Sequence, residues 1–348
     1  MSDFTTGTGQ NGLLPTPLFL NQAFNRVAST QLRLDAAEQQ RLSEFASRGI
    51  PPLVRTEMLA LLLGVSHKLL FAMARAPEKY YRSFRIPKRG GGFRDIATPR
   101  VFLKVVQRWI YESVLVRKRL PGYVTGFVPG GSIVRNASVH IGQRYVLKID
   151  IENFFPSIGR EKISAIYAEF GFPQKVVHLL TSLSLLDGRL PQGAPTSPCL
   201  ANAAFLPVDA QVFEVADSSG IKYSRYADDL TFSSNRPFRD DFRKTVERFI
   251  GSGGFRINRS KVRMMGPGQR LITTGLVLSV KAHPIRETRR QLRARFHQAK
   301  KSPREFSQQA NQLLGWAAFV NAYDPVLGAE YLRIARNVQI EARERFQG

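Results

Sequence analysis

The sequence of 348 residues predicts an α+β fold, with a small β-sheet in its middle and helices at both ends. Residues 144–151 alternate between polar and apolar side chains, as a half-buried strand does. Two shorter runs, residues 221–225 and 230–232, flank a short turn and predict a β-hairpin. Apolar side chains recur at helical spacing in residues 35–46, 306–320 and 325–346. A chain of this length can bury a sizeable core and form more than one lobe.

The N-terminal part is expected to be an extension that becomes helical. Residues 1–33 are rich in Gly, Thr, Asn and Pro and are expected to be loosely ordered. Residues 53–75 predict two short helices, broken near residues 64–66. Such a pair could be a DNA-binding helix-turn-helix, but its second helix is mostly apolar and is expected to pack. His67 and His178 have no acidic or cysteine partners at metal-binding spacing and are expected to be structural.

Three carboxylates stand at the ends of the predicted strands. Asp228 and Asp229 form the tip of the hairpin, and Asp150 ends the strand at residues 144–151. Adjacent aspartates are most often solvated turn residues, and an aspartate at a strand exit is common. Crowded carboxylates are nevertheless costly unless a cation neutralises them. Because Mg²⁺ takes oxygen ligands and shares them with substrate phosphates, this arrangement suits a two-metal site for phosphoryl transfer.

Two basic segments indicate contacts with a polyanion. Lys88 and Arg94 flank a turn of three glycines, which suits a hairpin that closes over a triphosphate; an exposed hairpin with basic tips is the alternative. Residues 281–304 hold nine cations against one acid, Glu287. These cations are Lys281, Arg286, Arg289, Arg290, Arg293, Arg295, Lys300, Lys301 and Arg304. A charge run is more often a solvated face, but a run of one sign in a helical segment favours contact with nucleic acid.

The overall composition agrees with a nucleic-acid partner. Lys and Arg number 51 against 27 Asp and Glu, which gives a formal net charge of +24. A ribosome-associated or peripheral membrane protein would share this charge but would not need three ordered carboxylates. The single cysteine, Cys199, excludes an internal disulfide and agrees with a reducing cytosol. No apolar run approaches the ~20 residues of a membrane helix, and no secretory signal is apparent, so a cytoplasmic protein without a membrane partner is expected.

Six segments, in order along the chain, resemble the motifs of reverse transcriptases. They are residues 86–96, residues 126–133, Asp150 with the following Phe-Phe-Pro-Ser-Ile, residues 190–198, Tyr226-Ala227-Asp228-Asp229 and residues 254–261. Agreement of six motifs in the order of the family is not expected by chance. The resemblance implies a right-hand polymerase, with fingers and a palm that contains an antiparallel sheet at residues 80–280. An N-terminal extension at residues 1–79 would precede them, and a helical basic thumb at residues 281–348 would follow.

The resemblance also implies roles for individual residues. Asp150, Asp228 and Asp229 would be the catalytic, metal-binding residues for two Mg²⁺ ions. Phe155 would lie against the sugar and exclude ribonucleotides, although core packing is an alternative for it and for Phe154. The other residues implied to line the nucleotide site are Lys88, Arg94, Gln192, Gly193, Tyr226 and Lys261. Of these, Tyr226 would lie beside the primer end, and Lys261 would contact the triphosphate or have a structural role. Those of the basic segment expected to bind nucleic acid are Arg286, Arg289, Arg290 and Arg293.

Two further segments resemble those of bacterial retron reverse transcriptases. Asn136 and His140 fit their Asn-Ala-x-x-His segment. Thr273, Thr274 and Gly275 stand where these enzymes usually carry Val-Thr-Gly, so Thr replaces Val here. Group II intron and abortive-infection reverse transcriptases share much of the palm, so these lineages remain alternatives.

The retron resemblance implies an RNA-directed DNA polymerase that copies a cognate structured non-coding RNA with dNTPs. Priming would start from a guanosine 2′-hydroxyl of the same RNA and give branched RNA–DNA, called msDNA. Such a polymerase would serve anti-phage defence together with a separate effector protein. The alternatives are an abortive-infection or group II intron-type enzyme and a non-catalytic RNA-binding scaffold. The short segment after the thumb argues against the intron type, and the three intact aspartates argue against the scaffold.

Overall fold

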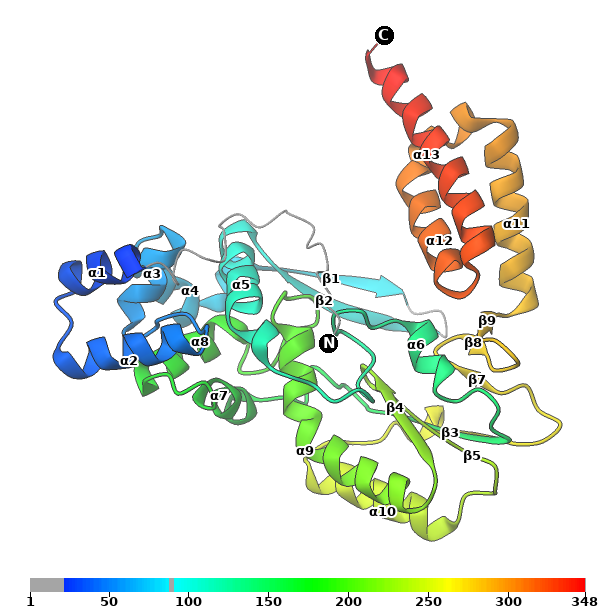
Figure 1. Ribbon diagram of the computed structural model, residues 1–348, viewed down its shortest axis with the longest axis horizontal. Coiled ribbons are helices and arrows are strands. Elements are labelled where there is room, and N and C mark those ends of the chain that lie inside the picture. Colours follow the sequence, from blue (N-terminus) through cyan, green and yellow to red (C-terminus); the bar gives the residue numbers. More distant parts are fainter. Residues whose placement is uncertain (1–21, 88–90, 348) are drawn as a thin grey trace, which may run out of the picture. The chain divides into compact units, whose positions relative to one another are not determined.

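The structure, a computed structural model, describes residues 22–87 and 91–347 (Figure 1). The chain divides into two compact units. The first contains residues 1–120 and 153–207, and the second contains residues 121–152 and 208–348. The predicted nucleotide contact Lys88 lies outside the described residues.

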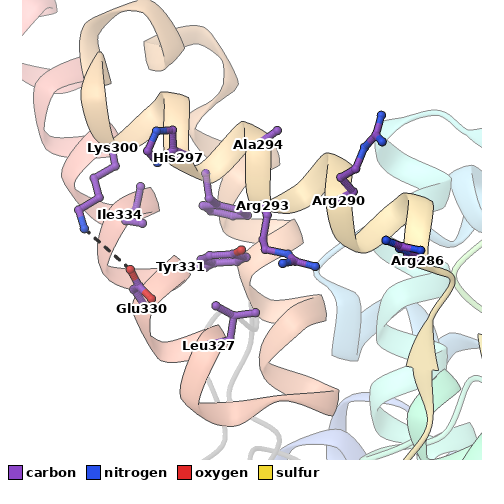
Figure 2. Close-up of a pocket in the computed structure, with 11 residues that line it drawn as sticks. Arg286, Arg290, Arg293, Ala294, His297, Lys300, Leu327, Glu330, Tyr331 and Ile334 are labelled. Atoms are coloured by element: carbon purple, nitrogen blue, oxygen red, sulfur yellow. Dashed lines mark ion pairs between the residues drawn. The ribbon is translucent and has the colours of Figure 1, made fainter. Parts of the chain in front are cut away.

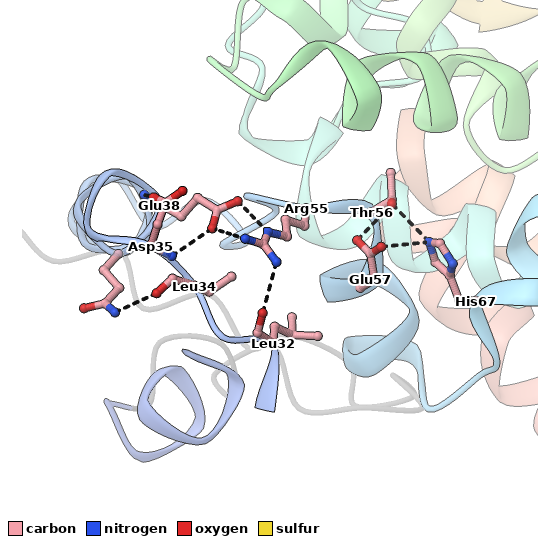
Figure 3. Close-up of polar contacts among 9 residues, drawn as sticks. Leu32, Leu34, Asp35, Glu38, Arg55, Thr56, Glu57 and His67 are labelled. Carbon is pink, nitrogen blue, oxygen red and sulfur yellow. Dashed lines mark hydrogen bonds and ion pairs between the residues drawn. The ribbon is translucent and has the colours of Figure 1, made fainter. Parts of the chain in front are cut away.

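The first unit begins with four helices: α1 (Gln22–Gln31), α2 (Ala36–Ser47), α3 (Thr56–Leu63) and α4 (His67–Arg75). The expectation of loose order up to residue 33 is therefore wrong from Gln22 onward. Burial of Ala28 against the rest of the unit stabilises α1 where local composition alone does not predict a helix. A capping box formed by Asp35 and Glu38 starts α2. Arg55 ties this cap to the next segment, because it donates to Glu38 and to the carbonyl of Leu32 (Figure 3).

The two short helices predicted within residues 53–75 are present as α3 and α4. Gly64, in the left-handed conformation at φ +65°, ends α3, and the helix axes bend by 111° at the break. Leu70 and Met73 of α4 are fully buried, as expected for a helix that packs against the protein. His67 has a structural contact with the Thr56 hydroxyl, at 3.0 Å (Figure 3).

The remainder of the first unit is a hairpin with helices. Strands β1 (Tyr81–Pro87) and β2 (Phe93–Pro99) pair antiparallel, between the 3₁₀ turn η2 (Pro77–Tyr80) and α5 (Val101–Ser113). The 3₁₀ turn η3 (Leu115–Arg117), α7 (Arg160–Ala168), α8 (Gln174–Ser184) and the first half of α9 (Ser197–Ser218) complete it. Its core is apolar, with Leu103, Ile110, Leu180 and Phe205 fully buried.

Helix α9 departs from the expectation that no apolar run reaches membrane length. Within the described residues it has the length and composition of a membrane crossing, and α3 with α4 would do so only as one bent span. Of the apolar window of α9, 61% is buried inside the protein, as in the core helix of a globular domain. These helices are therefore weak evidence for a membrane span.

The second unit is built on a four-stranded antiparallel sheet with the order β4-β5-β3-β6. The strands are β3 (Tyr145–Asp150), β4 (Lys222–Tyr226), β5 (Asp229–Ser234) and β6 (Arg263–Met265). Alternation gives this sheet one apolar face, on which Tyr223 and Phe232 stack with ring centroids 5.0 Å apart. Phe242 of α10 (Asp240–Ser252) packs edge-on against Phe232 at 5.4 Å. Sequence alternation thus placed β3, β4 and β5 close to their observed ends.

The unit also contains α6 (Ile133–Ser138), which precedes β3 in the chain, and the 3₁₀ turn η4 (Arg259–Lys261), which precedes β6. After β6, the three-stranded sheet of β7 (Ile272–Thr273), β8 (Leu276–Val277) and β9 (His283–Pro284) leads to a C-terminal helical bundle. The bundle contains α11 (Arg286–Lys301), η5 (Pro303–Gln309), α12 (Ala310–Tyr323) and α13 (Pro325–Gln347) (Figure 1). Phe296 and Tyr331 stack in its core with ring centroids 3.9 Å apart. The first of the two expected C-terminal helices starts at Ala310, because η5 occupies the residues before it.

Candidate active site

The register of two strands brings the three predicted carboxylates to one place. Strand β3 pairs with β5 so that Asp150 lies opposite Asp229. Strands β4 and β5 form a hairpin in which Tyr226 pairs with Asp229, which leaves Ala227 and Asp228 as the turn. The backbone N–H of Ile151 donates to the carbonyl of Asp228 at 2.9 Å. The fold therefore brings together aspartates that are far apart in the sequence.

The turn that carries Asp228 has an uncommon backbone conformation. Ala227 has φ +59°, in the left-handed region that side-chain-bearing residues avoid. The Arg225 guanidinium holds this turn by donating to the carbonyl of Ala227 at 2.9 Å. Gly126 approaches this turn closely, since a Cβ on residue 126 would lie only 2.6 Å from the Ala227 nitrogen. Strain of this kind persists only where neighbours enforce it, and it is frequent at functional sites.

Burial and mutual repulsion act on the carboxylates of this cluster. Burial, with Asp150 and Asp229 adding repulsion, raises the pKa of Asp228. Burial likewise raises the pKa of Asp229, which Lys148 opposes from 3.8 Å. Lys261 Nζ lies 3.0 Å from both carboxylate oxygens of Asp150. The structure therefore places positive charge beside the aspartates.

Of the two lysines beside the aspartates, Lys261 was identified from the sequence but Lys148 was not. Lys261 was a candidate for a triphosphate contact or a structural contact, and in the structure it pairs with Asp150. Lys148 was missed, although it stands two residues before Asp150 and so shares its face of the strand. That spacing was the available signal.

The donor set suits a hard divalent cation, although the side chains do not form a finished metal cage. Among residues 22–87 and 91–347, no group of three His, Cys, Asp or Glu side chains is arranged to hold a metal ion. Asp150 and Asp229, which are paired in register, and Asp228 in the adjoining turn nevertheless supply the oxygen ligands that Mg²⁺ prefers. Lys261, which pairs with Asp150, lies beside these oxygens.

A buried ion pair beneath the hairpin was not predicted from the sequence. Arg225 and Asp209 are both fully buried, and two guanidinium nitrogens of Arg225 bind the Asp209 carboxylate at 2.5 to 3.0 Å. The Tyr223 hydroxyl donates to the same carboxylate at 2.6 Å. Removing one partner of such a pair typically costs about 3–5 kcal/mol, because the other charge stays buried. The pair thus couples α9 to the strand that ends at the turn of Ala227 and Asp228.

The predicted nucleotide contacts of the first unit lie on β2 and on the segment after α8. Arg94 is exposed on β2. The carbonyl of Gln192 accepts from the Ala97 backbone at 2.9 Å, which fastens this segment to β2. Gly193 has φ +126°, and a Cβ there would lie 3.0 Å from the Ala97 carbonyl oxygen, so only glycine suits this position.

Phe154 and Phe155 differ in burial, which separates the two roles considered for them, core packing and contact with the sugar. Phe154 is 3% exposed and packs edge-on against Phe205 at 5.7 Å, so it belongs to the core. Phe155 is only half-buried and leaves part of its ring available. In the second unit, the ring of Tyr226 is also half-buried and lies 6.4 Å from that of Phe127.

The basic residues of the C-terminal bundle separate into two groups. A cavity of about 680 Å³ lies between α11 and α13 (Figure 2). Its lining includes Arg286, Arg290, Arg293, His297 and Lys300 of α11 and Leu327, Glu330, Tyr331 and Ile334 of α13. We call this cavity the thumb groove. Arg289, also expected to bind nucleic acid, does not line the groove, and its Nε is buried.

The two retron-like segments meet in the interior of the second unit. Asn136 and His140 are both 0% exposed. Thr274 and Gly275 form the turn between β7 and β8, with φ +46° and +79°. The Asn136 amide nitrogen lies 3.4 Å from the hydroxyl of Thr273, the residue before this turn.

Comparison with known proteins agrees with this architecture. Residues 86–306 match the family described as reverse transcriptase (RNA-dependent DNA polymerase). The chain belongs to this family. The retron Mx162 reverse transcriptase of Myxococcus xanthus is 35% identical over 82% of this chain and 67% of its own length. The retron Mx65 reverse transcriptase of the same organism is 33% identical over 81% of this chain and 71% of its own length. The retron Ec86 enzyme of Escherichia coli is 30% identical over 84% and 91%.

This reverse transcriptase is therefore of the bacterial retron type and is an RNA-directed DNA polymerase. The predicted α+β right-hand fold is confirmed. The division into an extension, a fingers–palm segment and a thumb stays a prediction, as do the roles of the individual site residues.

Proposed function

We propose that this reverse transcriptase extends a DNA strand at the site formed by Asp150, Asp228 and Asp229, with two Mg²⁺ ions as cofactors. The observation that carries the proposal is the register that places Asp150 opposite Asp229 beside the turn of Asp228. Raised pKa values of Asp228 and Asp229 support it, because crowded carboxylates favour a bound cation. The ions would supply activation of the primer hydroxyl and charge stabilisation at the triphosphate.

The protein's own residues would position the reactants. In this proposal Asp150, Asp228 and Asp229 hold the ions, and Lys148 limits the repulsion around Asp229. Arg94 and Lys88 would bind the incoming dNTP, with Gln192, Gly193 and Tyr226 beside it. Phe155 would exclude a ribose 2′-hydroxyl. Positioning and charge neutralisation would dominate, as is usual for phosphoryl transfer.

We further propose that the template is a structured non-coding RNA and that it also primes synthesis, from a guanosine 2′-hydroxyl. The product would be msDNA, and the enzyme would act in the bacterial cytoplasm in anti-phage defence with a separate effector. Similarity to three retron reverse transcriptases supports this proposal. The basic thumb groove, with cations from Arg286 to Lys300 along one helix, offers a surface for the RNA backbone.

Sequencing the nucleic acid that co-purifies with the enzyme tests the proposed product. We expect RNA joined to DNA through a 2′–5′ branch, with the DNA complementary to part of the same RNA. Linear DNA with no attached RNA would contradict priming from a 2′-hydroxyl and would favour an abortive-infection type of synthesis. RNA alone, from an enzyme that also fails to extend primers, would favour a scaffold without catalysis.

A further inference from the structure

The hairpin that carries Asp228 and Asp229 has one apolar and one hydroxyl-bearing face. Alternation along β4 and β5 puts Tyr223 and Phe232 on the apolar face. The other face presents Ser224, Thr231 and Ser233, each of which is 0% exposed. Buried hydroxyls are costly unless they have hydrogen-bond partners, so the segment that covers this face must provide them.

Asn136 and His140 provide the partners of Ser224 and Ser233. Asn136 Oδ1 accepts from Ser224 Oγ at 2.8 Å. His140 Nε2 lies 2.7 Å from the same hydroxyl, and His140 Nδ1 lies 2.7 Å from Ser233 Oγ. Since the one proton of Ser224 goes to Asn136, His140 Nε2 donates to Ser224 and Nδ1 accepts from Ser233. Burial lowers the pKa of His140 to about 3, so its ring is neutral and offers one donor and one acceptor.

This chain of hydrogen bonds links both strands of the hairpin. Ser224 is on β4 and Ser233 is on β5, so His140 bridges the strands that lead to the catalytic turn. Asn136 Oδ1 also accepts from the Thr125 hydroxyl at 2.7 Å. The next residue, Gly126, is the one that closely approaches Ala227 in the turn. Asn136 thus contacts the hairpin in two ways. It bonds to Ser224 of β4, and it bonds to Thr125, which precedes the glycine that lies close to the turn.

The second retron-like segment joins the same network. Thr273 Oγ1 lies 2.8 Å from Thr231 Oγ1 and accepts from Asn136 Nδ2 at 3.4 Å. A valine at this position, as in the usual Val-Thr-Gly, would have no hydroxyl for either contact. Thr274 has φ +46°, which β-branched residues avoid, and its hydroxyl closes the turn onto the Ile133 carbonyl at 3.1 Å.

We propose that Asn136 and His140 are positioning residues, which fix the β4–β5 hairpin from inside the protein and hold Asp228 and Asp229 in place without contacting RNA. This inference rests on the proposed metal-binding role of Asp228 and Asp229. Their complete burial leaves Asn136 and His140 no surface for nucleic acid. The retron-like segment therefore supports catalysis by holding the hairpin of Asp228 and Asp229 in position.

The test compares chemistry with binding in the full-length enzyme. The variants are Asn136→Ala, His140→Ala, His140→Gln and Thr273→Val. Single-nucleotide addition to a DNA primer on an RNA template gives the rate constant and the half-saturating Mg²⁺ concentration. Titration of the same primer–template gives its Kd. Ser138→Ala is the matched control, because Ser138 is exposed on α6 and bonds to Val134 of its own helix.

We expect Asn136→Ala to lower the rate constant by about 10²-fold, the order of loss when reacting groups shift by about 1 Å. It should raise the half-saturating Mg²⁺ concentration and leave the Kd within about twofold. His140→Gln, which retains a donor and an acceptor, should keep more activity than His140→Ala. Thr273→Val preserves side-chain shape, so its several-fold loss remains measurable if a larger change prevents folding. Ser138→Ala should match the wild type.

Two results would overturn this inference while the wild type remains active. One is a Kd raised tenfold or more with an unchanged rate constant, which would mean that the segment contacts RNA. The other is an unchanged rate constant and Kd in every variant. A wild type that adds no nucleotide would instead contradict the proposed function, and this inference with it.

Discussion

At the scale of the residue, the charge of Asp228 lowers the stability of the fold, although the proposed activity requires it. Because burial and neighbouring carboxylates raise its pKa, the folded protein binds this proton more tightly than the unfolded chain. The stability linked to this group is fully present below the unfolded value of 3.8 and is lost as the pH rises through the folded pKa. At neutral pH and without metal, Asp228 in its ionised form therefore destabilises the fold.

We predict that Asp228→Asn raises the thermal unfolding midpoint at pH 7 in the presence of a chelator. The gain should shrink as the pH is lowered toward 3.8, where the wild-type carboxyl also becomes neutral. Added Mg²⁺ should raise the midpoint of the wild type more than that of the variant. Asp217→Asn, at an exposed position on α9, is the control and should show no such pattern. A variant less stable than the wild type at pH 7 without metal would contradict this account of the site.

Phe155 should control the choice of sugar. Phe155→Ala removes the half-buried ring and should relax discrimination between dNTP and rNTP by about 10 to 10²-fold, with a smaller effect on dNTP use. Single-nucleotide incorporation measures the ratio. Phe154→Ala, which empties a core position, should cost about 3–5 kcal/mol of stability without altering the ratio. If Phe154→Ala relaxes selection and Phe155→Ala does not, the roles of the two rings are reversed.

At the scale of the element, helix α11 should bind nucleic acid through the stripe that lines the thumb groove. Changing Arg286, Arg290 and Arg293 together to Gln should weaken RNA binding and reduce its salt slope by roughly one unit per lost contact. Titrations at several salt concentrations measure both. Arg295→Gln is the control, because Arg295 does not line the groove and stacks on Trp316 at 4.4 Å. Unchanged affinity and slope in the triple variant would mean that the groove is only solvated.

Which elements the sequence could predict depended on their length and pattern. Strands β3, β4 and β5 alternate clearly, and α2 and α13 have helical periodicity, so their positions followed from local residues. Strands β7, β8 and β9 have two residues each, which is too short for any alternation to show. The basic run predicted cations on α11 but not which of their side chains face the groove. For that reason Arg289, whose Nε is buried, was grouped with the three arginines of the groove.

The site was predictable where one segment carries the chemistry and not where distant segments meet. Motif resemblance identified Asp150, Asp228 and Asp229 from the sequence. Lys261 and Asp150 are separated by 111 positions, and only the fold shows their ion pair. The partners of Asn136 are equally distant, since Thr273 lies 137 positions away. Such pairs depend on strand register and turn conformation, which no local pattern encodes.

At the scale of the whole molecule, the excess positive charge is distributed over both units. In the second unit it lines the thumb groove. In the first unit, a cavity of about 610 Å³ is lined by Arg48, Arg117, Lys118 and Arg119 with a single acid, Glu169. Charge of one sign on separate surfaces attracts polyanions of any sequence, and phosphate contacts alone do not encode preference for one RNA.

We propose above all that Asp150, Asp228 and Asp229 form the metal-dependent polymerase site. Primer extension on an RNA template with Mg²⁺ and dNTPs, by the wild type and by Asp228→Asn, tests it most directly. The variant retains the size of the side chain and loses one charge. We predict extension by the wild type that a chelator abolishes, and a rate at least ~10³-fold lower in the variant with unchanged RNA affinity. Near-wild-type extension by Asp228→Asn would contradict the assignment of the site.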